Sequence, residues 1–172
     1  MGVPEVRAAI VDRLMEPAIP GLTRVYRGLP VRFDDWPIGV DTGWGAGGYI
    51  HIGDIAESRI AFGGEHGGLK RVTYQSALVV SMRWLYADHG PNNQTDGWVD
   101  PLDELIADIT TRIRSDRTLA CGPDGPVWQA GEGENDIHTV IDDPREDEGQ
   151  VVVWFAVEFE VVEMDQQTEA NP

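Results

Sequence analysis

Two long stretches with apolar residues at alternate positions constrain the fold more than any other feature of this sequence. In residues 72–86 all even positions but one are apolar or aromatic, while the odd positions include polar and basic residues. In residues 151–162 the odd positions are all apolar, while Glu158 and Glu160 occupy the other side. A strand places successive side chains on opposite faces. We therefore expect two long strands, each with one buried face.

Two amphipathic helices are predicted, one before and one after the first of these strands. The first begins at Pro4 and ends before Pro17, because apolar residues recur between them at three- and four-residue steps. For the second, Asp100 is the expected N-cap, Pro101 the first helical residue and Arg114 the approximate end. Its apolar stripe consists of Leu102, Leu105, Ile106, Ile109 and Ile113.

Shorter strands and loops account for the rest of the chain. Strands are expected at Leu22–Tyr26, in two pieces within residues 49–62, and at residues 127–130 and 137–141. Irregular segments are expected as a long glycine- and tryptophan-rich loop at residues 34–48, an acidic turn at residues 142–148 and a disordered C-terminal tail at residues 165–172. The sequence thus predicts an α+β fold, with a mostly antiparallel sheet flanked by two helices, in a single domain over residues 3–164.

Size and composition are those of one globular domain. The 172 residues are 41% hydrophobic and 25% charged, which is the balance of a folded chain. The single cysteine, Cys121, allows neither an intrachain disulfide nor a cysteine-based zinc site within this chain. The N-terminus lacks the apolar stretch of a signal peptide, and no run approaches the ~20 apolar residues of a membrane span. We expect folding in a reducing cytoplasm without membrane insertion.

The net charge of −17 is unevenly distributed along the chain. Thirty acidic residues stand against 13 basic ones, and residues 132–172 hold thirteen acids and one base, which is −12 of the total. A surface of this sign repels phosphate groups. Sequence-independent binding to DNA or RNA is therefore disfavoured.

A glycine motif and the histidines give no support for a cofactor or metal site. Gly43, Gly45 and Gly48 satisfy the spacing of a dinucleotide-binding loop, but no strand precedes them and the following residues alternate instead of opening a helix. We interpret this segment as an ordinary loop. The four histidines lack the helical spacing of a metal site; they are His51, His66, His89 and His138.

The possible nucleophiles and the paired carboxylates also do not indicate a specific catalytic or metal-binding site. Cys121 precedes a turn and is interpreted as an inert thiol, and none of the serines lies in a nucleophile elbow. Adjacent acids such as Asp142 and Asp143 can bind a divalent cation, but in a chain this acidic they also arise as solvated surface. We therefore predict no catalytic, cofactor or metal-binding residue, and no enzymatic activity.

Tryptophan is the one residue type whose placement indicates a contact surface. Trp36, Trp44 and Trp98 fall in predicted loops, and Trp154 lies on the more polar side of the last strand. Exposed aromatic side chains are typical of protein interfaces. These four residues are the predicted interface, although the loops could also fold back so that the indoles cover the edges of the sheet.

The segment after the first helix reads IPGLTRVY at residues 19–26 and leads into GLP at residues 28–30. Together with the order of the predicted elements, it resembles the tail terminator proteins of long-tailed, siphovirus-type bacteriophages. The resemblance covers residues 3–164. It implies a largely antiparallel sheet with two helices, a long central strand before the second helix and a closing strand.

The resemblance also implies a structural role in the virion. Proteins of this family form a ring, typically hexameric, on the last ring of tail-tube subunits, where the ring stops tube growth and offers a docking face for the head. The implied partners are other copies of this chain, the tail-tube protein and a neck protein of the head–tail connector. The implied location is the head–tail junction of the virion, after folding in the host cytoplasm.

Such a ring would explain the negative charge. A lumen through which DNA slides should not bind phosphate, and −17 repeated around a ring would line a channel with repulsion. The acids expected to face this lumen are Asp142, Asp143, Glu146, Asp147, Glu148, Glu158 and Glu160.

Other hypotheses stay open at this point. The segments at residues 34–48 and 121–136 are long for a minimal terminator and would also suit a neighbouring neck, head–tail connector or minor tail protein. A small acidic binding or regulatory module that mimics nucleic acid belongs to another class. A metal-assisted enzyme that uses the acid pairs with His51 or His138 is the third.

Overall fold

The described part of the chain folds as a sheet-rich α+β structure. The structure is a computed structural model that describes residues 2–32, 39, 42–61, 68–85, 97–122, 125–131 and 137–166. In chain order its elements are α1 (Val3–Met15), β1 (Leu22–Tyr26), β2 (Trp44–Ala61), β3 (Gly68–Leu85), α2 (Val99–Arg114), β4 (Gln129–Ala130), β5 (His138–Ile141), β6 (Arg145–Asp147) and β7 (Gln150–Gln166).

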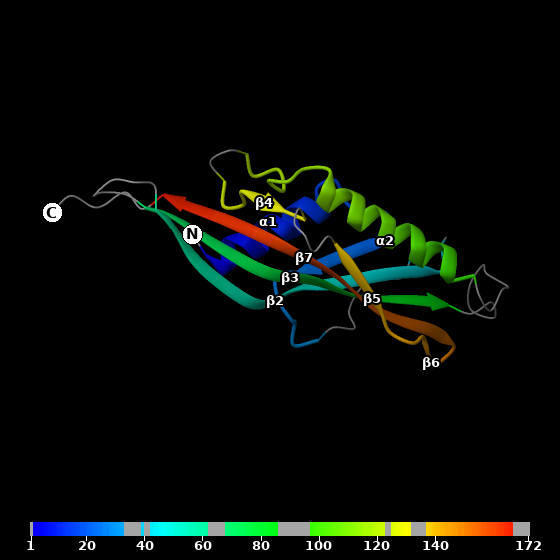
Figure 1. The fold of residues 1–172 in the computed structure, drawn as a ribbon. Coiled ribbons are helices and arrows are strands. Elements are labelled where there is room, and N and C mark those ends of the chain that lie inside the picture. Colours follow the sequence, from blue (N-terminus) through cyan, green and yellow to red (C-terminus); the bar gives the residue numbers. More distant parts are fainter. Residues whose placement is uncertain are drawn as a thin grey trace.

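One curled sheet contains all of these strands, and β2, β3 and β7 form its centre (Figure 1). The strand order is β1-β2-β3-β7-β4, with β5 and β6 also paired to β7. Only β1 and β2 are parallel, and the other pairs are antiparallel. The prediction of a mostly antiparallel sheet with two helices is confirmed.

Both helices lie on the same face of the sheet and enclose the core against it (Figure 1). The even positions of β3 from Val72 to Trp84 and the odd positions of β7 from Val151 to Val161 are buried, as their alternation predicts. The apolar stripe of α2 meets them through Leu102, Leu105, Ile109 and Ile113. Burial of each large apolar side chain contributes about 1.5–3 kcal/mol to folding.

The loop predicted at residues 34–48 is shorter than expected, because β2 already begins at Trp44. Backbone hydrogen bonds need no side chain, so the glycine-rich residues 44–48 pair with β3 without showing a strand pattern. Gly48 has a packing reason as well, since a Cβ there would lie 3.0 Å from the carbonyl oxygen of Val79. The two strand pieces predicted within residues 49–62 are one strand, whose register shifts between Ile52 and Ile55.

The predicted acidic turn at residues 142–148 is also wrong in extent. Arg145–Asp147 forms β6, an edge strand paired with the start of β7. The turn itself is confined to Glu148 and Gly149, whose φ angles of 45° and 81° are those of a two-residue hairpin turn. Charged side chains are tolerated here because the strand is exposed and lies at the sheet edge.

The remaining boundaries differ by a few residues. The second helix begins at Val99 with Trp98 as its N-cap, so Asp100 lies in its first turn instead of capping it. The last strand continues to Gln166, which places two residues of the predicted tail in the sheet. Residues 167–172 lie outside the described part.

Candidate functional site

The sheet has an open face, opposite the one that the helices cover. It is formed by side chains that alternate with the buried ones, so neighbouring strands contribute residues at paired positions. No helix of the described residues covers it (Figure 1). Its exposed or half-buried side chains include Tyr49, His51, Thr73, Gln75, Ala77, Val79, Trp154, Ala156, Glu158 and Glu160. The open face therefore carries polar, charged and apolar side chains together.

Polar side chains connect the strands across this open face. The Nε2 atom of Gln75 donates a hydrogen bond to Glu160, at 3.3 Å, and Arg71 lies 3.6 Å from the other carboxylate oxygen of Glu160. His138 of β5 lies 3.5 Å from Glu158 of β7. Exposed pairs of this kind contribute about 0.2–1 kcal/mol each. Glu158 and Glu160, the two acids of β7 that are predicted to face a lumen, therefore have polar or basic neighbours.

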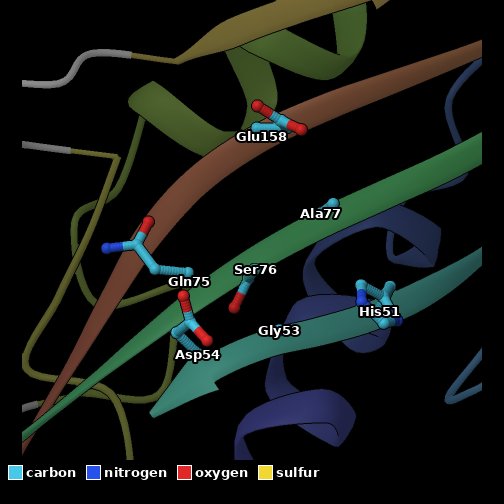
Figure 2. Close-up of a pocket in the computed structure, with 7 residues that line it drawn as sticks. All are labelled: His51, Gly53, Asp54, Gln75, Ser76, Ala77 and Glu158. Carbon is cyan, nitrogen blue, oxygen red and sulfur yellow. The ribbon is translucent and has the colours of Figure 1, made fainter. Parts of the chain in front are cut away.

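A shallow hollow of about 250 Å³ lies on this face where the register of β2 shifts (Figure 2). Asp54 lies beside Gln75, while His51 and Glu158 stand on opposite sides of β3 (Figure 2). Ser76 also lines the hollow. Across the described residues no three His, Cys, Asp or Glu side chains are grouped closely enough to hold a metal ion. The hollow therefore offers polar contacts without a converging ligand set.

The other predicted lumen acids form a second group at the edge of the sheet. We call Asp142, Asp143, Glu146, Asp147 and Glu148 the acidic edge. All five side chains are exposed, on β6 and on the short segments directly before and after it. The seven acids thus divide between the acidic edge and the open face.

The four predicted interface tryptophans have different surroundings. Trp36 lies outside the described residues. Trp44 and Trp98 are half-buried and pack against the core, and the placement of Trp44 in a loop is wrong because it begins β2. Trp154 is half-buried on the open face. Trp128, which is exposed next to β4, was not among the predicted interface residues, although its alternation with the buried Val127 is a signal that could have identified it.

A buried polar pair lies at the other end of the sheet, where the sequence analysis predicted no site. The hydroxyl of Tyr74 donates a hydrogen bond of 2.6 Å to Glu163, and both residues are buried. Burial raises the pKa of Tyr74, and the hydrogen bond to Glu163 and its charge add to this rise. Glu163 occupies an odd-numbered position of β7, as the buried residues Val151 to Val161 do. The alternation along this strand could therefore have identified Glu163 as buried. The pair joins β3 to β7 across the sheet.

Other candidate residues have ordinary surroundings. Cys121 is half-buried, and burial raises the pKa of its thiol, which disfavours the reactive thiolate. Gly45 and Gly48 of the dinucleotide-like motif lie inside β2, so the interpretation as a loop is wrong, and no helix follows them. His66 and His89 lie outside the described residues. Among the described helices none is long and apolar enough to cross a membrane.

Comparisons with known proteins add the following findings. No protein-family model and no curated protein matches the sequence. One solved structure, whose name states no function, is similar over 94% of this chain and 96% of its own, with 15% sequence identity and a TM-score of 0.42. At that level of similarity it carries no inference about function.

Proposed function

We propose that this chain is a structural virion protein that forms a ring at the head-proximal end of a phage tail tube. The ring ends tube growth and provides the interface on which the head docks. The role is that of a subunit and not of an enzyme. Its partners are copies of itself, the tail-tube protein and a neck protein, at the head–tail junction.

The observation that carries this proposal is the order and one-sided arrangement of the elements. A helix, a short strand, two long strands, a second helix, three short strands and a long closing strand follow one another. The long strand before the second helix and the closing strand are the features that the resemblance implies. Both helices cover one face, which leaves the other face and the acidic edge for contacts with neighbours. A subunit of an assembly needs such surfaces in addition to a closed core.

The charge supports a lumen that does not bind DNA. A net charge of −17 per subunit repels phosphate, and a ring multiplies this repulsion in its channel. The acidic edge and the open face hold the seven acids that we expect to face the lumen. Replacement of Glu146, Asp147 and Glu148 by lysine should make the assembled ring retain duplex DNA at low salt, and an unchanged ring would remove this explanation.

Electron microscopy of the chain mixed with tail tubes of the same phage tests the proposal. We expect rings on one end of each tube. Tubes that stay bare with a molar excess of folded chain would contradict it. Gel filtration with light scattering separates the proposal from a small acidic binding module, which the same negative surface would also suit, since such a module stays monomeric in the presence of tubes.

A further inference from the structure

A short positive segment interrupts the negative charge of this chain. Residues 17–33 contain three arginines and no acid, within a sequence of net charge −17. The arginines are Arg24, Arg27 and Arg32, and all three are exposed. They lie on β1 and on the segment that follows it. We call these three residues, with the apolar residues described next, the basic edge.

Exposed apolar side chains accompany the arginines. Leu29 is 73% exposed and Val31 is 105% exposed. At the opposite edge of the sheet, beside the acidic edge, Val140 and Ile141 of β5 are 42% and 49% exposed. Each edge therefore combines two exposed aliphatic residues with a net charge, which is positive at the basic edge and negative at the acidic edge, where five acids outnumber the exposed Arg145 of β6. Two surfaces of this kind are complementary to each other and not to themselves.

The two edges also lie at the same level of the sheet. Arg24 pairs with Gly47, and Gly47 pairs with Ser81. Ser81 pairs with Trp154, whose carbonyl oxygen accepts a hydrogen bond of 2.8 Å from the backbone N–H of Asp142. One line across the sheet thus joins an arginine of one edge to an aspartate of the other. A neighbouring copy displaced along this line would bring such an arginine and aspartate together.

Strand direction allows the sheet to continue from one copy to the next. β1 is parallel to β2, and two antiparallel steps through β3 give β7 the same direction. β5 runs antiparallel to β7, so it is also antiparallel to β1. Within residues 2–32 and 137–166, neither β1 nor β5 has a strand paired to its outer side. An edge without a partner is a template for pairing with another chain.

We propose that copies of this chain associate head to tail, with the basic edge of one copy against the acidic edge and β5 of the next. The contact joins two different surfaces, so it forms a closed ring where the rotation between copies closes and a filament where it does not. The inference rests on the proposed function in taking a second copy as the occupant. It names the contact that would build the ring.

Charge exchange tests the contact. Arg24→Glu with Arg27→Glu should weaken self-association at least tenfold in sedimentation velocity, and so should Asp142→Arg with Asp143→Arg. All four substitutions in one chain exchange the two signs and should restore most of the association. A matched control, Arg59→Glu with Arg117→Glu, makes the same change in net charge at exposed positions elsewhere and should leave association within about twofold.

Three results would overturn the inference. One is a control pair that weakens association as much as the edge pair does. The second is a fourfold variant, folded by circular dichroism, that associates no better than either double variant. The third is a wild-type chain that stays monomeric up to its solubility limit.

Cysteine cross-linking tests the head-to-tail direction and separates this inference from the proposed function. In a Cys121→Ser background, Arg24→Cys with Asp142→Cys should give a ladder of disulfide-linked oligomers, while either cysteine alone should give monomers. Dimers from Arg24→Cys alone, or no ladder at all, contradict the contact.

The same variant separates the contact from the proposed function. Capped tubes without a ladder would support the function and contradict this contact. A ladder with bare tubes would support the contact and contradict the function.

Discussion

Removal of the Tyr74 hydroxyl tests whether the buried pair with Glu163 stabilises the sheet. Tyr74→Phe keeps the ring in the core but removes the donor of a 2.6 Å hydrogen bond to a buried carboxyl group. Hydrogen bonds to charged groups contribute about 1.5–3 kcal/mol, so we expect a loss of about 2 kcal/mol in the free energy of unfolding. For a chain of this length the melting temperature should fall by about 4–8 °C.

The pH dependence gives this prediction a signature that a simple packing defect lacks. Folding raises the pKa of Tyr74 above its ordinary value of 10.0. The stabilisation is therefore fully present below pH 10 and is lost as the pH rises above it, by about 1.4 kcal/mol per pH unit. The difference of about 2 kcal/mol between wild type and Tyr74→Phe should thus close between about pH 10 and pH 11.5.

Guanidinium unfolding, followed by tryptophan fluorescence from pH 7 to pH 11.5, measures both effects. Glu163→Gln is the matched variant, because its amide oxygen still accepts the hydrogen bond while the charge is gone. It should lose less than Tyr74→Phe at pH 7. Its loss of stability should begin near pH 10, as in the wild type, but should level off at a lower pH, because without the Glu163 charge the pKa of Tyr74 is raised less. Equal stability of wild type and Tyr74→Phe at pH 7, with parallel profiles up to pH 11.5, would show that the hydrogen bond to Glu163 does not stabilise the fold.

Three further predictions concern packing and exposure. Gly21→Ala should destabilise the fold by more than about 1 kcal/mol in thermal unfolding, because φ is +78° and a Cβ would overlap the Trp44 ring; wild-type stability would show that this contact is absent. Ile109→Ala, in the buried stripe of α2, should lower the free energy of unfolding by about 2–5 kcal/mol. The exposed Asp108→Ala should lower it by less than about 0.5 kcal/mol, and equal losses would contradict the packing of this helix. Trp128→Ala should change stability by less than about 0.5 kcal/mol, since the side chain is exposed; a larger loss would indicate buried contacts.

Alternation predicted the centre of the sheet because one face of each long strand is buried. Val151 to Val161 on β7 carry this pattern without interruption, and Val72 to Trp84 on β3 carry it with Ser76 as the one polar residue on the buried side. The apolar stripe of α2 was equally clear, because the helix covers the core with one side only. These elements bury apolar side chains against one another, and the sequence records this requirement directly.

Elements held by backbone pairing alone were not predictable in the same way. The first residues of β2 are mostly glycine, and β6 is charged at all three positions, so neither shows a hydrophobic period. Their strand structure depends on the neighbouring strand that offers hydrogen bonds. The buried Glu163 also departs from residue-type rules, although it keeps the phase of β7.

The candidate contact surfaces depend on tertiary structure even more strongly. The charges of Arg24 and Asp142 are visible in the sequence, but their common level on opposite edges follows from the register of four pairings. The exposure of Trp128 and the partial burial of Trp44 likewise depend on which strand each one joins. The composition therefore indicated a negative surface, but only the fold shows that the seven predicted lumen acids lie partly on an edge and partly on the open face.

The length of tail tubes grown with and without this chain tests whether the chain terminates tube growth. The tail-tube protein of the same phage would be polymerised from tail tips, with the chain added in increasing amounts, and tube lengths would be measured by electron microscopy. If the chain is a terminator, growth stops earlier as more chain is added and each stopped end carries a ring of it. Tubes that keep growing at the same rate, with no density from the chain at their ends, would show that it is not a terminator.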